Sequence, residues 1–400
     1  MTRPINVLFI HQSAELYGSD KVLLYLVSGM ARRRAVWPIV VLPEKGPLWD
    51  ELVAAGVEVH IAEIAKIKRS VFSPSGLLGL IRKAGVALRH YDALVAGRPI
   101  AVVHSNTLAV LGGAVWAWRR RVLHLWHVHE IILSPKLVGC AFPLALRLLA
   151  DKVMSNSTRT EHWLLGHQPT LQSRSVVVFN GLPEQAPPNA QAAAAFRASI
   201  QAALNVVLIV LAGRLNHWKG QGLLIDAALL MTRRTGGLAG VRFLIVGDAA
   251  PGQDDVRVQL LRQVAEAGLD AAFTFVPFLN DIRPVWWAAD IAVVPSTEPE
   301  PFGMVAIEAM AAGVPVVAAG HGGLLDIVEH ERTGLLFEPR NVLALADALQ
   351  RLIADAGLRR SMGAAGQLRQ QQQFSAENQI ENTEQVYVDM LNGCTRTAQN

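Results

Sequence analysis

Glu300 and Glu308 are two carboxylates whose spacing suits the binding of a polar ligand. The apolar run 291–294 ends at a Pro-Ser pair and predicts a buried strand, whereas residues 302–312 predict a helix that stops at a Gly-Val-Pro sequence. Glu300 then precedes the helix, and Glu308 lies about two turns inside it. A carboxylate in so apolar a helix needs polar partners, such as sugar or ribose hydroxyls, and the free N–H groups at the helix start suit a phosphate. The alternative is a surface glutamate beside a helix-capping glutamate.

Five short motifs follow one another around these glutamates. Together they resemble the retaining glycosyltransferases of the GT-B fold, specifically family 4, whose donor-site signature is a Glu, seven residues and a second Glu. The resemblance covers residues 205–345 densely and the N-terminal half more thinly. The motifs are Gly213-Arg214-Leu215 with Lys219-Gly220, Val293-Val294-Pro295-Ser296, Gly313-Val314-Pro315-Val316-Val317, Gly322-Gly323-Leu324-Leu325-Asp326-Ile327-Val328 and Thr333-Gly334-Leu335-Leu336-Phe337.

The resemblance implies an α/β protein of the GT-B type, with two doubly wound Rossmann-like domains facing a central cleft. It also implies a retaining, metal-independent hexosyltransferase that moves a sugar from a UDP- or GDP-sugar to a saccharide or lipid-linked acceptor in polysaccharide or glycoconjugate assembly. No cofactor and no nucleic-acid partner are expected. Two alternatives remain open: a GT-B nucleotide-sugar epimerase, which needs no separate acceptor, and a catalytically silent sugar-binding or scaffolding protein.

By resemblance, four residues of the C-terminal half contact the donor. Arg214 and Lys219 contact the diphosphate, the arginine as a fork and the lysine as a point charge. Glu308 binds the ribose hydroxyls and Glu300 lies against the sugar. Retention is compatible with Glu300 as a covalent nucleophile or with departure and attack on one face, and the sequence leaves both open. The alternative for Arg214 and Lys219 is a pair of solvated loop residues.

Further donor-site residues follow from the same resemblance. The backbone of Phe302, Gly303 and Met304 approaches the phosphates, and Pro277 passes the base. In the N-terminal half, Gly18 allows close approach of the backbone to a phosphate or acceptor, unless it is only a turn before a helix. His129 faces the donor sugar from the end of a strand; His127, on the same side of that strand, is the alternate, and a packed core histidine is the other interpretation.

The order of apolar runs and helical patterns predicts two doubly wound parallel sheets. We expect a first domain over residues 1–183, a linker over 181–195, a nucleotide-sugar domain over 184–374, and a terminal helix within 375–400 that rejoins the first domain. The expected strands lie at 7–10, 39–42, 57–61, 101–104, 122–127, 152–156, 176–179, 206–212, 242–246, 273–276, 291–294, 316–318 and 334–337.

Charge is distributed unevenly. The first 183 residues hold 21 Lys/Arg and 11 Asp/Glu, whereas the rest hold 16 and 22. A basic N-terminal half favours an anionic partner, and the basic, apolar segments 66–83 and 116–121 suit either a membrane interface or ordinary helix packing. The two cysteines suggest a reduced compartment, and the uncharged stretch 99–118 predicts a strand, a loop and a short helix rather than a membrane span. We therefore expect a cytoplasmic protein with peripheral attachment to the inner face of the membrane.

Overall fold

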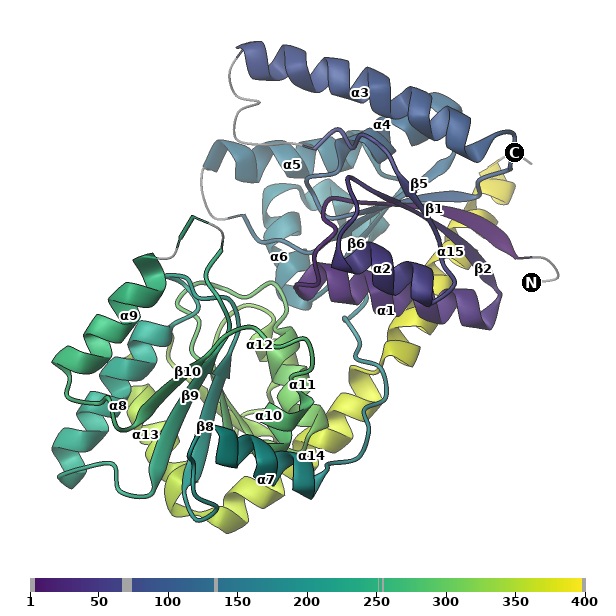
Figure 1. Ribbon diagram of the computed structural model, residues 1–400. Coiled ribbons are helices and arrows are strands. Elements are labelled where there is room, and N and C mark those ends of the chain that lie inside the picture. The colour runs from purple at the N-terminus through teal and green to yellow at the C-terminus, as the bar shows by residue number, and fades with distance from the viewer. Residues whose placement is uncertain (1–3, 67–73, 133–135, 251, 254, 398–400) are drawn as a thin grey trace. The chain divides into compact units, whose positions relative to one another are not determined.

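The computed structural model describes residues 4–66, 74–132, 136–250, 252–253 and 255–397. The chain divides into two compact units: unit 1 comprises Met1–Pro183 and Ser375–Asn400, and unit 2 comprises Glu184–Phe374. Each unit contains one parallel sheet packed against helices (Figure 1). The α/β class predicted from the apolar runs is therefore confirmed.

The sheet of unit 1 has seven strands in the order β3-β2-β1-β4-β5-β6-β7. The chain reverses direction across the sheet between the neighbouring strands β1 and β4, because β2 and β3 extend one side and β5, β6 and β7 the other. In doubly wound sheets, ligands bind outside the carboxyl ends of the strands at such a point. The strands are β1 (Ile5–His11), β2 (Val36–Leu42), β3 (Glu58–Ile61), β4 (Val102–Asn106), β5 (Leu123–Val128), β6 (Lys152–Ser155) and β7 (Ser175–Val177).

Both faces of this sheet are buried. Along β1, Val7 and Phe9 belong to one hydrophobic core, and Leu8 and Ile10 belong to another, as the two-residue period of a strand requires. The first core also takes in residues of α1 and α15, whereas the second takes in residues of α3 and α4. The helices are α1 (Gly18–Arg33), α2 (Pro47–Ala54), α3 (Pro74–Val95), α4 (Leu111–Arg120), α5 (Lys136–Leu149), α6 (Thr158–His167), the 3-10 turn η2 (Pro169–Arg174) and α15 (Ala376–Thr397).

Helix α15 comes last in the chain but is part of unit 1. Its residues Ile380, Val386 and Met390 lie in the same core as β1, and the hydroxyl of Tyr387 is 2.7 Å from His104 Nδ1 on β4. Arg33 at the end of α1 binds Glu377 and Glu381 of α15. The helix therefore completes one face of the first sheet.

The sheet of unit 2 has six strands in the order β10-β9-β8-β11-β12-β13, with the reversal between β8 and β11. The strands are β8 (Val207–Ala212), β9 (Val241–Val246), β10 (Phe273–Val276), β11 (Ile291–Val294), β12 (Val316–Ala319) and β13 (Gly334–Phe337). The helices are α7 (Ala190–Ser199), α8 (Gln221–Thr235), α9 (Asp255–Glu266), α10 (Arg283–Ala288), α11 (Met304–Ala311), α12 (Leu324–Ile327), α13 (Val342–Ala354) and α14 (Ala356–Gln373).

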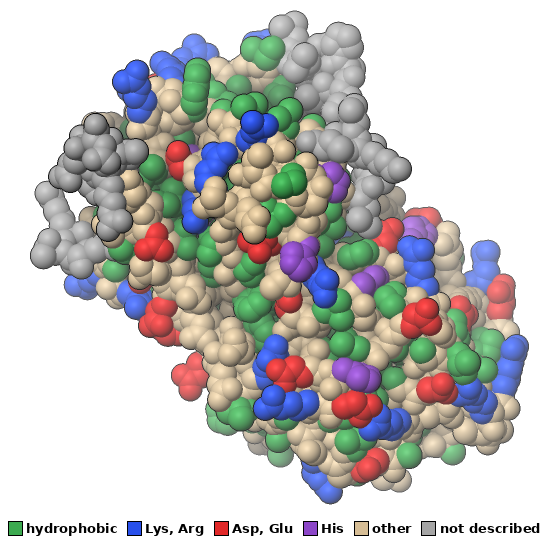
Figure 2. Space-filling view, turned by 180° about the vertical axis from the view of Figure 1, so that it is seen from behind, with side chains coloured by type: hydrophobic (Ala, Val, Ile, Leu, Met, Phe, Trp, Pro, Cys, Tyr) green, Lys and Arg blue, Asp and Glu red, His purple; other side chains and the backbone are tan. Residues whose placement is uncertain are grey.

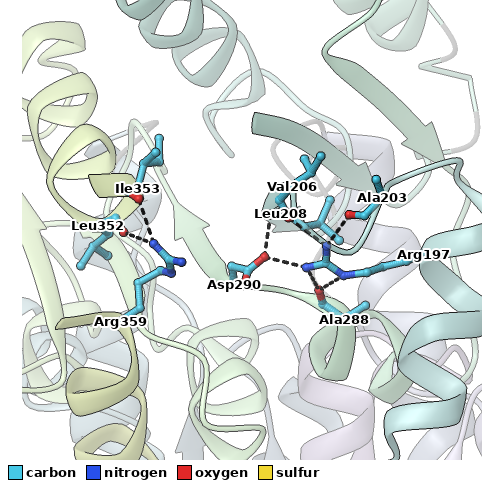
Figure 3. A network of polar contacts seen from close by, with 9 residues as sticks. All are labelled: Arg197, Ala203, Val206, Leu208, Ala288, Asp290, Leu352, Ile353 and Arg359. Atoms are coloured by element: carbon cyan, nitrogen blue, oxygen red, sulfur yellow. Dashed lines mark hydrogen bonds and ion pairs between the residues drawn. The ribbon is translucent and has the colours of Figure 1, made fainter. Parts of the chain in front are cut away.

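A buried arginine anchors the start of unit 2 (Figure 3). Arg197 on α7 donates hydrogen bonds to the carbonyls of Ala288, Ala203 and Val206, and it pairs with Asp290 at 2.6 Å. Asp290 also accepts the N–H of Leu208 at 2.8 Å. The guanidinium thereby ties α7 to the end of α10 and to the start of β8.

Two expectations about local structure are wrong. The alanine run in the expected linker 181–195 forms the first turns of α7, because alanine is the strongest helix former and Asn189 caps the helix by accepting the N–H of Ala192. The helix after β11 begins at Met304, so Glu308 is its fifth residue and lies little more than one turn inside it.

Residues 99–118 form β4 and most of α4, and no helix in the described part of the chain has the length and apolar character needed to span a membrane.

Candidate active site

The loops after β8 and β11 meet at the point where the sheet of unit 2 reverses. In the β8 loop, Asn216 Oδ1 accepts the N–H groups of Trp218 at 3.2 Å and Lys219 at 2.8 Å, which folds the segment into a tight turn. Gly220 ends this turn with a φ of 80°, and a Cβ there would lie 2.0 Å from the carbonyl oxygen of Pro295. Only glycine fits this position, so the two loops are packed backbone to backbone.

A hydrogen bond between the backbones fixes the same contact. The N–H of Thr297 in the β11 loop donates to the carbonyl of Trp218 at 2.7 Å. The side chains that follow Trp218 and Thr297 in their loops, Lys219 and Glu300, are thereby held next to each other.

Lys219 and Glu300 form a largely buried ion pair. Lys219 Nζ lies 2.6 Å from Glu300 Oε1, and the side chains are 17% and 5% exposed. Ser296 donates its hydroxyl to the same oxygen at 2.6 Å, and Lys219 Nζ is 4.5 Å from the centre of the Trp218 ring. The carboxylate is thus satisfied by one cation and one hydroxyl.

The loop after β12 closes around Glu300. A Cβ at Gly322 would lie 2.2 Å from the carbonyl oxygen of Glu300, and the N–H of Gly323 donates to that oxygen at 2.7 Å. His321 donates from Nε2 to the carbonyl of Ser296 at 2.8 Å, and burial lowers the pKa of this histidine. Ser296 and His321 are site residues to which the sequence gave no role; their positions within and beside two of the motifs were the only pointers to them.

The first turn of α11 contains the other predicted contacts. Gly303 precedes the helix with a φ of 122°, and a Cβ there would lie 2.7 Å from Leu324 Cδ2, so glycine is required by the fold itself. Phe302 is buried and its ring packs edge-to-face with Phe374, which leaves its backbone for any ligand contact. Met304 is the first helical residue and Glu308 is half-buried on the next turn.

Arg214 and Pro277 lie at the same edge of the sheet. Arg214 directly follows Gly213 at the end of β8, is half-buried, and its carbonyl accepts from Gln221. Pro277 follows β10 and is exposed. Asp248, after β9, joins the two loops: its carbonyl accepts the N–H of Leu215 and its carboxylate accepts the N–H of Phe278, each at 2.9 Å.

In unit 1, Gly18 and His129 lie beyond the carboxyl ends of β1 and β5, respectively, and His127 lies on β5. His129 is 8% exposed, its Nε2 is 2.9 Å from Asn106 Oδ1, and burial lowers its pKa to about 3, so the imidazole is neutral. The ring of His127 lies 3.8 Å from that of His129, but His127 is fully buried, and neither of its nitrogens has a partner among the described residues. Gly18 is the exposed first residue of α1, where a Cβ would meet no atom within 4 Å.

The residues 194–369 match the family model of the Glycosyl transferases group 1. This match covers less than half of the chain and lies within unit 2. D-inositol 3-phosphate glycosyltransferase of Pseudarthrobacter chlorophenolicus is 36% identical over 165 residues, which is 41% of this chain and 38% of that protein. An uncharacterized glycosyltransferase of Methanocaldococcus jannaschii is 32% identical over 194 residues, 48% of this chain and 47% of that protein. Each match thus spans less than half of the relative's length, and both relatives are named as glycosyltransferases.

Solved structures resemble the chain over nearly its whole length. HepE of Anabaena in complex with UDP and glucose has a TM-score of 0.81 and 25% identity, over 96% of this chain and 100% of HepE. Sucrose-phosphate synthase of Thermosynechococcus elongatus has a TM-score of 0.78 and 22% identity, over 97% of this chain and 100% of that one. The protein has the GT-B fold, as the motifs predicted.

Proposed function

We propose that the protein is a retaining glycosyltransferase of family 4 that uses a UDP- or GDP-sugar. The acceptor we propose is a saccharide or lipid-linked intermediate in polysaccharide or glycoconjugate assembly at the cell envelope. In this reaction the bond between the anomeric carbon and the diphosphate oxygen breaks, and the nucleoside diphosphate leaves with both electrons. An acceptor hydroxyl oxygen bonds to the same face of the sugar and gives up its proton to the leaving diphosphate. Structures of HepE in complex with UDP and with UDP-glucose support the choice of donor.

The observation that carries the proposal is the Lys219–Glu300 pair beside the N-terminus of α11. A leaving diphosphate gains negative charge, and a lysine, an arginine and a helix start are groups that stabilise it without a metal. Arg214 and Lys219 have this role in our proposal, and the backbone of Phe302 to Met304 supplies the N–H groups. Ser296 and Lys219 both act on Glu300 Oε1, which favours a carboxylate that orients the sugar over one that attacks it.

Unit 2 also offers separate groups for ribose and sugar. In our proposal, Glu308 accepts hydrogen bonds from the ribose hydroxyls, Glu300 contacts the transferred sugar, and Pro277 borders the base. His129 and the backbone at Gly18 contribute from unit 1, to the sugar and to a phosphate or the acceptor, respectively. Two rival functions differ from this proposal. A nucleotide-sugar epimerase needs no separate acceptor, and a silent sugar-binding or scaffolding protein performs no chemistry.

A nucleotide-sugar screen tests the proposal directly. The donor should raise the melting temperature as its concentration exceeds its Kd. Glu308→Ala should weaken the binding of UDP and UDP-sugar (or the GDP pair) alike, whereas Glu300→Ala should mainly weaken that of the sugar nucleotide. Transfer to an acceptor must then be detected with retention at the anomeric carbon. Equal losses for both ligands in both variants would contradict the assigned roles, and sugar inversion on the free nucleotide would favour the epimerase.

A further part of the proposal concerns attachment to an anionic membrane surface. Helices α3 and α5 both pack against α4 in unit 1, and their exposed side chains include apolar and basic residues: Ile81 and Arg82 on α3, Trp118 on α4, and Leu144, Arg147 and Leu148 on α5. Figure 2 shows basic and hydrophobic side chains next to one another on the surface of the protein. Such a surface suits anionic headgroups. Lys68 and Arg69 of the predicted basic segment lie outside the described residues.

Vesicle sedimentation tests this attachment. The double variant Leu148→Ser with Arg147→Glu should release the protein from anionic vesicles, because it removes an apolar contact and reverses a charge worth about 1 kcal/mol near the headgroups. Leu204→Ser is the matched control, since Leu204 is as exposed but belongs to unit 2. Equal partitioning of the wild type between neutral and anionic vesicles, or none at all, would rule the attachment out.

A further inference from the structure

A chain of hydrogen bonds in unit 1 connects a carboxylate to His129. His11 Nε2 lies 2.7 Å from Asp20 Oδ1, Asn106 Nδ2 lies 2.9 Å from His11 Nδ1, and Asn106 Oδ1 lies 2.9 Å from His129 Nε2. All four residues are buried. These four residues make up the Asp20–His129 chain.

The sheet itself brings these residues together. β1, β4 and β5 are neighbours, and the register pairs His11 at the end of β1 with Asn106 at the end of β4. His129 follows β5 directly, and Asp20 lies in the first turn of α1. The Asp20–His129 chain therefore lies at the carboxyl edge of the sheet. In this class of fold, ligands bind at that edge, beside the point between β1 and β4 where the strand order reverses.

The orientation of the Asn106 amide sets the positions of the protons, because its Nδ2 faces His11 Nδ1 and its Oδ1 faces His129 Nε2. Nδ2 only donates, so His11 accepts at Nδ1 and carries its proton on Nε2, from which it donates to Asp20. Oδ1 only accepts, so it receives the N–H of His129 Nε2. His129 therefore carries its proton on Nε2, and its Nδ1 is left as a hydrogen-bond acceptor.

We propose that Asp20, His11 and Asn106 are positioning residues that fix His129 in this tautomer, so that Nδ1 accepts a hydrogen bond from a hydroxyl of the transferred sugar. Within the described part of the chain, Nδ1 of His129 has no partner of its own. The inference rests on the proposed function. Its consequence for specificity is that a donor sugar with hydrogen or fluorine in place of that hydroxyl leaves Nδ1 unpaired and is rejected.

The groups around His129 keep the imidazole neutral. Burial is the main cause that lowers the pKa of His129, and Asp20 acts in the opposite direction. His127, whose ring is in contact with that of His129, and His104 behind it also have pKa values lowered by burial. Glu130 accepts the backbone N–H of His129, and burial raises the pKa of its carboxyl to about 7. A neutral imidazole has one donor and one acceptor, which makes the tautomer decisive.

Asp20 has a second role that must be separated from this one. Its other oxygen, Oδ2, accepts the N–H of Tyr17 at 3.0 Å and caps α1. Asp20→Asn keeps the side-chain shape but lets position 20 donate as well as accept, whereas Asn106→Leu breaks the chain and leaves the cap untouched. Asp50→Asn is the matched control: Asp50 also lies in a first helical turn, that of α2, and is exposed.

The measurement is the protonation of the imidazole nitrogens in the full-length protein, by NMR with 15N-labelled histidine. The His129 resonances are assigned by their loss in His129→Gln. In the wild type and in Asp50→Asn, we expect the proton on Nε2. In both Asp20→Asn and Asn106→Leu, we expect protonation to shift toward Nδ1, and kcat/KM for the donor to fall about 5- to 30-fold, the loss of roughly one hydrogen bond. The affinity for the free nucleoside diphosphate should stay unchanged.

A wild-type His129 protonated on Nδ1 would overturn the inference. So would a His129 tautomer that is the same in the wild type, Asp20→Asn and Asn106→Leu. If Asp20→Asn lowers stability and only Asn106→Leu changes the tautomer, Asp20 is a helix cap and not part of the positioning chain. The tautomer measurement needs no substrate, so failure to find any nucleotide-sugar donor would refute the proposed function separately.

Discussion

Replacement of Lys219 tests whether the Lys219–Glu300 pair serves ligand binding or only the fold. Lys219 is the only lysine in residues 184–374, so no neighbouring lysine can substitute for it. At the 2.6 Å separation of the pair, Coulomb's law with an effective dielectric constant of about 20 gives an attraction of about 6 kcal/mol, most of which offsets the removal of both charges from water. Ser296 still donates to Glu300 after the change. We therefore expect Lys219→Ala to lower the free energy of unfolding by about 2–3 kcal/mol.

Ligand binding should respond differently. Loss of a charge-assisted hydrogen bond to a diphosphate costs about 1.5–3 kcal/mol, so the Kd for UDP or GDP should rise about 10- to 100-fold. The rate of transfer should fall by about 10²–10³, because the charge on the leaving group is greatest in the transition state. Glu300→Gln frees Lys219 from its partner, and it should leave nucleotide affinity unchanged or raise it.

A double-mutant cycle separates the two effects. In urea unfolding, Lys219→Ala and Glu300→Gln should be coupled by about 1–2 kcal/mol, because each removes the same pair. In titration calorimetry with UDP and GDP, the loss caused by Lys219→Ala should persist in the Glu300→Gln background. Arg234→Ala is the control, since Arg234 pairs with Asp347 on the exposed surface of the same unit. Wild-type nucleotide affinity in Lys219→Ala, or recovery of affinity in the double variant, would refute the binding role.

Three further predictions concern other parts of the molecule. Gly18→Ala should raise the free energy of unfolding by about 0.4–1 kcal/mol, since the added Cβ meets no atom within 4 Å. It should weaken ligand or acceptor binding if a ligand approaches the backbone there, and unchanged binding constants would remove Gly18 from the site. Transfer should continue in excess EDTA, and a loss restored by Mg²⁺ or Mn²⁺ would contradict the assignment of Arg214 and Lys219. Burial lowers the pKa of His124 to about 4 and that of His129 to about 3. Unfolding therefore takes up protons below the unfolded pKa of about 6.5, and each imidazole should lower the free energy of unfolding by about 1.4 kcal/mol per pH unit as the pH falls from about 6 toward 4. Urea unfolding at pH 7 and pH 5 should show this decrease, and equal stability at both would be evidence against it.

The fold was largely readable from local patterns. Each of the thirteen expected strands exists, because the continuous apolar runs of a doubly covered sheet are distinctive. The ends of the strands moved by up to three residues, since hydrogen bonds between neighbouring strands, and not hydrophobicity, decide where a strand stops. The helix after β11 starts late because Gly303 adopts a φ that a helix does not allow.

The sequence predicted the charged residues of the site but not the residues that they contact. Glu300 and Lys219 were identified separately, each for a contact with the donor, and only the packing of Gly220 on Pro295 reveals that they bind each other. The connection from Asp20 through His11 and Asn106 to His129 spans three strands, and no pattern in the sequence predicts which ends of strands become neighbours. Contacts of this kind depend on strand order, which a single sequence does not specify.

The position of α15 has a consequence for how the protein is made. Unit 2 is one continuous stretch of chain, whereas the core of unit 1 needs Ile380, Val386, Tyr387 and Met390 from the last helix. On the ribosome, roughly 190 residues of unit 2 are synthesised before that helix, which takes about 10–40 s at about 5–20 residues per second. During that time the apolar surface that β1 and α1 present to α15 stays uncovered. The domain that begins first is therefore the one that finishes last, and the interval in between is when this chain most needs a chaperone.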